Sequence, residues 1–142
     1  LHEFTNEQLK FSYRKCGALL DKPLIFTRAW LRGTSGKREE IEARIAKIKE
    51  EREGSQPVRS RTGGSTYKNP EGHKAWQLID AAGLRGFAMG GAQVSEKHCN
   101  FFINTGTATA ADLENLIKEV QSKVLAHSGI KLEPEIKIIG KY

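Results

Sequence analysis

The sequence has few cysteines and no long apolar run. Its two cysteines, Cys16 and Cys99, lie far apart and form no C-x-x-C pair, so neither a disulfide scaffold nor a structural zinc site is expected. This usage favours a reducing compartment. The apolar runs are too short to span a bilayer, and no basic-then-apolar start with a cleavage site occurs. The first residues, LHEFTNEQLKF, begin as a fragment or a processed chain would.

Several functional signatures are also missing. Aromatic residues make up 8% of the chain, and neither an RRM nor a KH signature is present, which argues against an RNA-binding domain. No Walker P-loop and no G-x-S-x-G nucleophile elbow occur. No internal repeat or low-complexity tract appears, so the 142 residues suit one globular domain with a buried core.

The charge that is present is mostly positive. The formal net charge is +6, which favours anionic partners such as nucleic acid or phosphate-bearing ligands. In residues 36–54 the signs alternate, as on a solvated helix face. The excess of basic residues is more concentrated elsewhere, at Arg28, Arg32, Arg59, Arg61, Lys68 and Lys74.

Periodicity and turn signals predict an α+β fold, in which helices pack on a small mixed or antiparallel sheet. The clearest helix is residues 107–129, with a capping pair at Thr109 and Asp112 and a glycine stop at Gly129. Its apolar stripe is Leu113, Leu116, Ile117, Val120 and Val124. The other predicted elements are strands at 23–33, 101–106 and 130–142, helices at 34–54 and 73–86, a loop at 55–74 and a glycine-rich turn at 89–100.

The stretch RTGGSTYKNPEGHKAW, residues 61–76, raises the first question of function. In one interpretation, Gly63, Gly64 and Ser65 form a flexible turn, which is common for such a triplet. In the other, backbone amides and the Ser65 hydroxyl face an anionic ligand. Because a serine hydroxyl is a very weak acid, it can protonate only a strong base such as a carbanion or an enolate.

Two charged residues have equally open interpretations. Glu135 follows Pro134 at the start of an apolar segment, where a carboxylate is usually exposed, although one held near a buried site could polarise or protonate a substrate. Arg14 follows Tyr13 and could pair with a surface acid or bind a carboxylate or phosphate in bidentate fashion.

The segment VSEKHC, residues 94–99, offers weaker candidates. A hydrolase site from Ser95 and His98 lacks a third member at a suitable spacing. A metal site from Glu96, His98 and Cys99 is not expected either, because adjacent residues of a strand point to opposite faces. We therefore expect His98 to be structural.

Four segments resemble one family when they are taken in order. They are YR at 13–14, QPVRSRTGGSTYKNPEG at 56–72, LIDAAGLRGFAMGGAQVSEKHCNFFINTG at 78–106 and LEPEIKIIG at 132–140. Together they resemble UDP-N-acetylenolpyruvylglucosamine reductase, in its shorter, second subclass, over nearly the whole chain. The resemblance implies a cytoplasmic flavoprotein of peptidoglycan precursor synthesis that reduces UDP-N-acetylglucosamine enolpyruvate to UDP-N-acetylmuramate. In that family NADPH reduces FAD, and reduced FAD delivers hydride to the enolpyruvyl group.

The resemblance also implies roles for individual residues. Ser65 aligns with the serine that protonates the enolate-like intermediate. Glu135 and Arg14 align with residues beside the substrate carboxylate, where they would stabilise developing charge. The residues expected to help hold the nucleotide-sugar are Tyr13, Gly64, Lys68 and Asn69.

The resemblance further implies a division of the chain. Residues 1–20 would be the tail of an upstream FAD-binding region, and residues 21–142 the C-terminal substrate-binding domain. We therefore expect the chain alone to bind FAD poorly and not to turn over, and its FAD-contacting residues cannot be named. The alternative is a non-catalytic module that binds nucleotide-sugars or other phosphate ligands.

Overall fold

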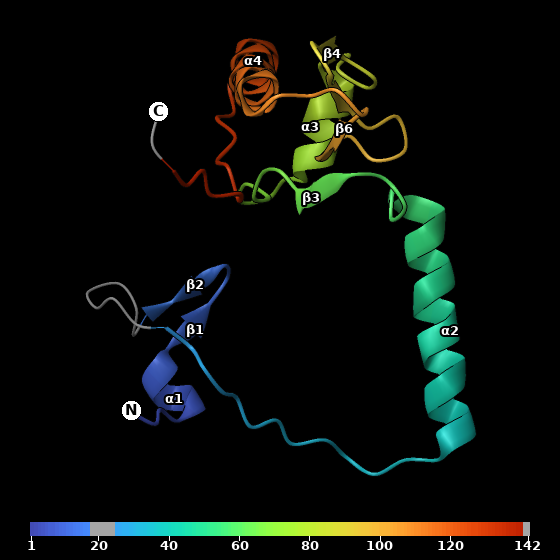
Figure 1. Cartoon of the computed structure of the whole chain (residues 1–142), viewed down its shortest axis with the longest axis vertical. Coiled ribbons are helices and arrows are strands. Elements are labelled where there is room, and N and C mark those ends of the chain that lie inside the picture. The colour runs from blue at the N-terminus through green and yellow to red at the C-terminus, as the bar shows by residue number, and fades with distance from the viewer. Residues whose placement is uncertain (18–24, 141–142) are drawn as a thin grey trace. The chain divides into compact units, whose positions relative to one another are not determined.

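A computed structural model of the chain describes residues 1–17 and 25–140 (Figure 1). The chain forms two compact units, Leu1–Gly36 and Lys37–Tyr142, and each is described by itself. The described residues combine helices with small antiparallel sheets, so the predicted α+β class is confirmed. No helix in this part of the chain is long and apolar enough to cross a membrane.

The first unit is built from one helical turn and a hairpin. Helix α1, Asn6–Leu9, begins at a capping box in which the Thr5 and Gln8 side chains each bond the other's backbone. Strands β1, Phe11–Ser12, and β2, Lys15–Cys16, pair antiparallel and leave a two-residue turn between them. Residues 25–33 were predicted to be part of a strand, but those described are neither helix nor strand. Although rich in β-formers, they pair with no described strand, and residues 23 and 24 lie outside the described ranges.

The second unit contains a four-stranded antiparallel sheet in the order β3-β6-β5-β4. Its strands are β3, Thr62–Ser65; β4, Ala88–Met89; β5, Ala92–Val94; and β6, Phe101–Asn104. The predicted strand at 101–106 is therefore confirmed as β6. The predictions of a loop over 55–74 and a turn over 89–100 were wrong in part, because both contain short strands whose glycines masked the pattern.

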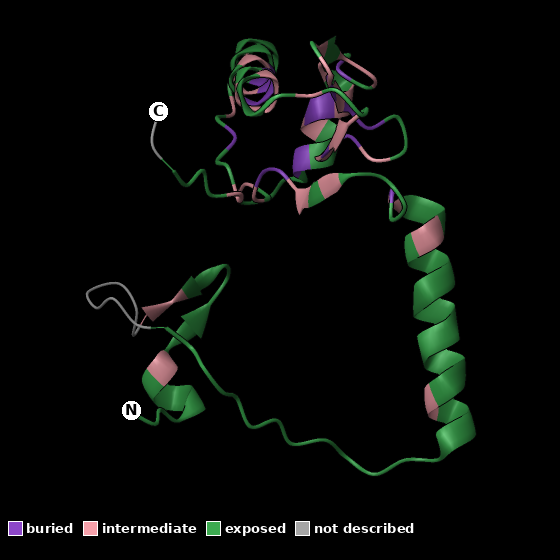
Figure 2. Ribbon diagram, viewed as in Figure 1, coloured by how far each residue is buried: buried purple, intermediate pink, exposed green. Residues whose placement is uncertain are grey.

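Helices α3, Ala75–Ala81, and α4, Ala110–Ser128, pack against this sheet and share one core with it (Figure 2). Alternation along the strands sends one set of side chains into that core, as period-two geometry requires. Its fully buried members include Ala92 and Val94 of β5, Ile79 of α3, and Leu116, Val120 and Val124 of α4.

The helix predicted at 107–129 forms as expected. The Thr109 side chain accepts from the Asp112 backbone while Asp112 accepts from the Thr109 backbone, and Gly129 ends the helix with a left-handed φ of 72°. These bonds to Thr109 hold the pKa of the Asp112 carboxyl below its usual range. Helix α3 confirms the predicted element near 73–86.

The helix predicted at 34–54 is confirmed as α2, Arg38–Ser55. It has no buried residue, and Ile45 and Ile48 of its apolar spacing are exposed. Arg38 pairs with Glu42 one turn later, consistent with a solvated, alternating face.

The strand predicted at 130–142 does not form in the described residues to 140. Only an isolated bridge between Tyr67 and Pro134 is present. Proline has no backbone N–H, so it cannot continue a ladder of hydrogen bonds beyond this bridge.

Candidate functional site

The glycine pair before Ser65 lies in strand β3, at an irregularity in the pairing. Thr62 is opposite Ile103 and Ser65 is opposite Phe101, so β3 has one residue more than β6 between these pairs. Gly64 absorbs the extra residue with a φ of +87°, and its N–H donates to the Thr62 hydroxyl at 3.2 Å. Such a φ favours glycine, so the backbone conformation alone accounts for a glycine at position 64.

Ser65 is the last residue of β3 and is half-buried. The next two residues, Thr66 and Tyr67, are buried at 3% and 1% exposure. The chain therefore passes from a partly exposed strand into the core immediately after the serine, which fixes the backbone on that side.

The segment around Glu135 lies beside this backbone. The Glu135 N–H donates to the Thr66 carbonyl at 2.8 Å, and the Lys68 N–H donates to the Glu133 carbonyl at 2.9 Å. Both bonds flank the bridge between Tyr67 and Pro134. Glu135, half-buried, is thus tied to Thr66, the residue that follows Ser65, although 69 positions separate them in the chain.

A third segment holds the same backbone from the other side. The Asn100 carbonyl accepts from the Thr66 N–H at 2.8 Å. Its side-chain oxygen accepts from the Tyr67 N–H at 3.0 Å, and its side-chain nitrogen donates to the Tyr67 carbonyl at 2.8 Å. No local sequence pattern indicated Asn100, whose bonds to Tyr67 cross 33 positions.

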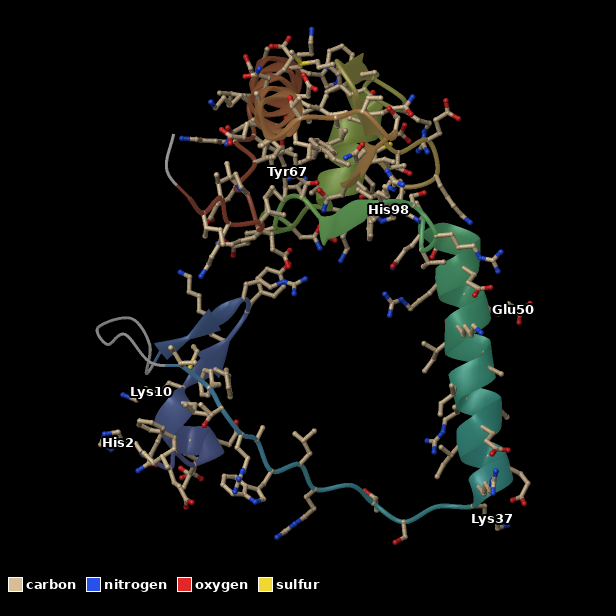
Figure 3. All side chains as sticks on the ribbon, in the orientation of Figure 1. His2, Lys10, Lys37, Glu50, Tyr67 and His98 are labelled. Carbon is tan, nitrogen blue, oxygen red and sulfur yellow. The ribbon has the colours of Figure 1, made fainter. Side chains whose placement is uncertain are left out.

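Tyr67 anchors the segment to helix α4, and its side chain lies between β3 and α4 (Figure 3). Its hydroxyl donates to the Ile117 carbonyl at 2.5 Å, and its ring packs edge-on to Phe102. Burial raises the pKa of the Tyr67 phenol far above its usual range.

Lys68 and Asn69 follow directly and have structural contacts of their own. The Lys68 ammonium pairs with the Glu133 carboxylate. The Asn69 side-chain oxygen accepts from the Ala75 N–H at 3.0 Å, at the start of α3. Both residues therefore lie near the Ser65 segment, and the contacts described are with other parts of the protein.

Tyr13 and Arg14 belong to the first unit, where they form the turn of the β1–β2 hairpin. The Arg14 guanidinium lies over the Tyr13 ring, 5.5 Å from its centroid. Arg14 has a φ of +58°, a conformation that costs energy in a non-glycine residue and that is enriched at functional sites.

The rejected hydrolase candidates have structural partners. Ser95 is buried, and its hydroxyl accepts from the Lys97 and His98 backbone amides. The His98 Nδ1 accepts from the Asn100 N–H at 3.3 Å, and its ring packs edge-on to Phe101. Burial lowers the pKa of the His98 imidazole, which favours its neutral form.

Cys99 is fully buried, and its thiol contacts the Asp80 carboxylate at 3.7 Å. Arg85 binds that carboxylate through two nitrogens and holds the Asp80 pKa below its usual range. Within the described ranges, no group of three His, Cys, Asp or Glu side chains is arranged to hold a metal ion.

A cavity of about 500 Å³ opens in the second unit between the end of α2 and the sheet. It is lined by residues 53 and 56–60 on one side and by Gln93, Ser95 and Ile103 on the other. None of the predicted site residues, Ser65 and Glu135 included, lines this cavity.

Comparison with known proteins gives this arrangement a family. The model of the UDP-N-acetylenolpyruvoylglucosamine reductase C-terminal domain matches residues 56–139. The chain is 58% identical over 139 residues to the UDP-N-acetylenolpyruvoylglucosamine reductase of Parvibaculum lavamentivorans, and 60% identical over 134 residues to that of Paramagnetospirillum magneticum. These matches cover 98% and 94% of this chain.

A solved structure supports the same family. The crystal structure of UDP-N-acetylenolpyruvylglucosamine reductase from Thermus caldophilus matches 73% of this chain and 36% of its own, with a TM-score of 0.62 and 37% identity. The chain spans 44% and 43% of the length of the two bacterial relatives. The match to the domain model covers more than half of the chain, and the chain belongs to the UDP-N-acetylenolpyruvoylglucosamine reductase family, of which it represents a C-terminal portion.

Proposed function

We propose that this chain is the substrate-binding portion of a longer, cytoplasmic reductase. The substrate is UDP-N-acetylglucosamine enolpyruvate and the product is UDP-N-acetylmuramate, a precursor of peptidoglycan. Family membership supports the reaction, and one structural observation supports the site. The Glu135 N–H donates to the Thr66 carbonyl, which places a carboxyl group on the segment beside the Ser65 segment.

The proposed reaction adds a hydride to the methylene carbon of the enolpyruvyl group and a proton to the neighbouring carbon. The electron pair of the double bond moves onto that second carbon and its carboxylate, which gives an enolate-like anion. The Ser65 hydroxyl donates its proton to this carbon, forming the C–H bond, and the serine recovers a proton from solvent. An enolate is a base strong enough to accept a proton from a serine.

Two further residues would act on the substrate carboxylate. Arg14 would bind it through its guanidinium, which can donate two parallel hydrogen bonds to a carboxylate. Glu135 would act as a hydrogen-bond donor to the oxygen on which negative charge develops. The residues that would hold the nucleotide-sugar are Tyr13, Gly64, Lys68 and Asn69.

The described residues do not by themselves fit a flavin. Gly90 and Gly91 join β4 to β5, and a Cβ at Gly91 would lie 2.3 Å from the Ala108 nitrogen, so the chain's own backbone closes this turn. Gly63 and Gly64 lie within β3. Neither pair opens the strand-to-helix turn that cradles a pyrophosphate. We propose that FAD, with NADPH as its reductant, is bound by an upstream region that supplies the hydride.

The proposal divides the chain into residues 1–20, the tail of that upstream region, and residues 21–142, the substrate-binding domain. The boundary itself lies outside the described residues, whereas the two compact units divide after Gly36 and the family model begins at residue 56. The division therefore remains a proposal.

The test uses the full-length protein, meaning this chain with the region encoded upstream of it. NADPH is added without oxygen, and the enolpyruvyl substrate follows. The proposal predicts that flavin absorbance is bleached by NADPH and restored by the substrate, with UDP-N-acetylmuramate as product. A protein that binds the substrate but never reoxidises its flavin would instead be a non-catalytic nucleotide-sugar module.

A further inference from the structure

Asn100 stands where the β3–β6 ladder would otherwise end. The last regular pair is Ser65 with Phe101, the first residue of β6. Before Phe101 the chain turns, because the Phe101 N–H donates to the His98 carbonyl at 2.9 Å. The backbone beyond Asn100 is therefore unable to pair with the residues that follow Ser65.

The side chain of Asn100 replaces the missing pair. A primary amide has a carbonyl acceptor and two N–H donors, whereas a peptide group has one acceptor and one donor, so one orientation of the amide can bond both backbone groups of Tyr67. Its oxygen takes the Tyr67 N–H at 3.0 Å and its nitrogen donates to the Tyr67 carbonyl at 2.8 Å. Asn100 is only 4% exposed and Tyr67 only 1%, so these bonds are shielded from bulk solvent.

The same backbone segment carries the Glu135 side of the site. Residues 66–68 lie between Asn100 on one edge and residues 133–135 on the other. The Thr66 N–H donates to Asn100, and the Thr66 carbonyl accepts from Glu135. A shift of this segment would therefore move Ser65, its neighbour in sequence, and Glu135, its neighbour in space, together.

We propose that Asn100 is a positioning residue for the reaction. By holding both backbone groups of Tyr67, it fixes the distance between the Ser65 hydroxyl and the Glu135 carboxyl that act on the enolpyruvyl group. The inference rests on the proposed function for its catalytic consequence. The structural coupling between Asn100 and the Glu135 segment can be measured independently of that function.

The catalytic test compares two half-reactions in the full-length protein. Asn100→Ala should slow flavin reoxidation by the enolpyruvyl substrate about 10- to 100-fold, because small misplacements of reacting groups have effects of this size. Flavin reduction by NADPH should be unchanged. Equal slowing of both half-reactions, or of neither, would contradict a positioning role.

Asn104 provides the matched control, since it lies at the other end of β6. Its side-chain oxygen accepts two backbone amides, from Gly106 at 2.8 Å and Ala108 at 3.1 Å, away from Ser65. Asn104→Ala should lower the melting temperature to a similar degree without slowing reoxidation. If it slows reoxidation as much as Asn100→Ala does, general destabilisation is the cause and the proposal fails.

A conservative variant gives a pH signature that lost packing alone would not produce. In Asn100→Asp, the ionised carboxylate accepts the Tyr67 N–H but cannot donate to the Tyr67 carbonyl, whereas the protonated acid can do both. Relative to the Asn100→Ala protein, reoxidation in the Asn100→Asp protein should recover as pH falls. A constant ratio of the two rates across pH would contradict the proposed bond to the Tyr67 carbonyl.

Hydrogen exchange separates this inference from the proposed function. In Asn100→Ala the Glu135 amide should exchange faster, although its own bond goes to Thr66, and Asn104→Ala should leave it unaffected. If the wild-type flavin is never reoxidised by the substrate, the proposed function fails. The exchange rates still test whether Asn100 holds the Glu135 segment in place. An unchanged exchange rate of the Glu135 amide in Asn100→Ala would overturn the inference that Asn100 positions this segment.

Discussion

The Glu135 N–H donates to the Thr66 carbonyl across 2.8 Å and joins two segments that lie far apart in the sequence. Thr66 directly follows Ser65, so one backbone hydrogen bond brings the regions of the proposed proton donor and the proposed carboxyl together. On its other edge the Thr66 N–H donates to the Asn100 carbonyl. The proposed site is therefore arranged around a short segment, residues 66–68, that is hydrogen-bonded on both sides.

The two glycines before Ser65 should respond differently to the same substitution. Gly64→Ala should reduce the free energy of unfolding by about 1–2 kcal/mol, because a φ of +87° brings a Cβ into conflict with its own backbone. Gly63→Ala should cause no such loss, since Gly63 has no positive φ and its Cβ would meet nothing within 4 Å. Denaturant titration of both variants checks this, and equal losses would mean that φ does not explain Gly64.

Glu135 and Glu133 flank Pro134 and form a second matched pair. Glu135→Ala should lower kcat about 10²- to 10³-fold, the effect of removing one preorganised donor from developing charge. Glu135→Gln should retain more activity, because its amide can still donate. Glu133→Ala removes an ion pair with Lys68 in which the glutamate is 71% exposed, and kcat should change little. Steady-state kinetics of the full-length variants measure all three effects, and a larger loss in Glu133→Ala would reverse the assignment.

Tyr67→Phe should lower the free energy of unfolding by about 1 kcal/mol. The lost bond is the one to Ile117, whose carbonyl keeps its helical partner inside α4, so the loss stays modest. Burial raises the Tyr67 pKa in the folded state, so the unfolded chain releases this proton first, and stability falls as pH rises above about 10. The difference in the free energy of unfolding between the wild type and Tyr67→Phe should therefore shrink at high pH. A constant difference between pH 8 and 11 would contradict this.

The purified 142-residue chain should contain no stoichiometric flavin and should not oxidise NADPH in the presence of the enolpyruvyl substrate. The physical reason is that neither glycine pair of its described residues forms a dinucleotide cradle. An absorbance spectrum of the protein after reconstitution with FAD measures the bound flavin. A flavin content of one per chain would place the cofactor site within these residues.

The sequence predicted best what depends on neighbouring residues. The capping box of Thr109 and Asp112 and the apolar stripe of α4 are local patterns, and both formed as predicted. Ser65 and Glu135 were singled out through family motifs, and the structure brings their segments together. The strands expected at 130–142 and at 23–33 were wrong in the residues described, because a strand requires a partner that no local pattern specifies. Asn100 was missed for the same reason, since its bonds to Tyr67 cross 33 positions.

The most direct measurement is reoxidation of the NADPH-reduced flavin by the enolpyruvyl substrate in full-length Ser65→Ala, with Ser60→Ala as an exposed control. Ser65→Ala should bind the substrate with unchanged Kd and reduce its flavin normally, yet restore the oxidised flavin and form UDP-N-acetylmuramate far more slowly, because the intermediate lacks its proton donor. Ser60→Ala should behave as wild type. Normal product formation by Ser65→Ala would show that the serine is not the proton donor.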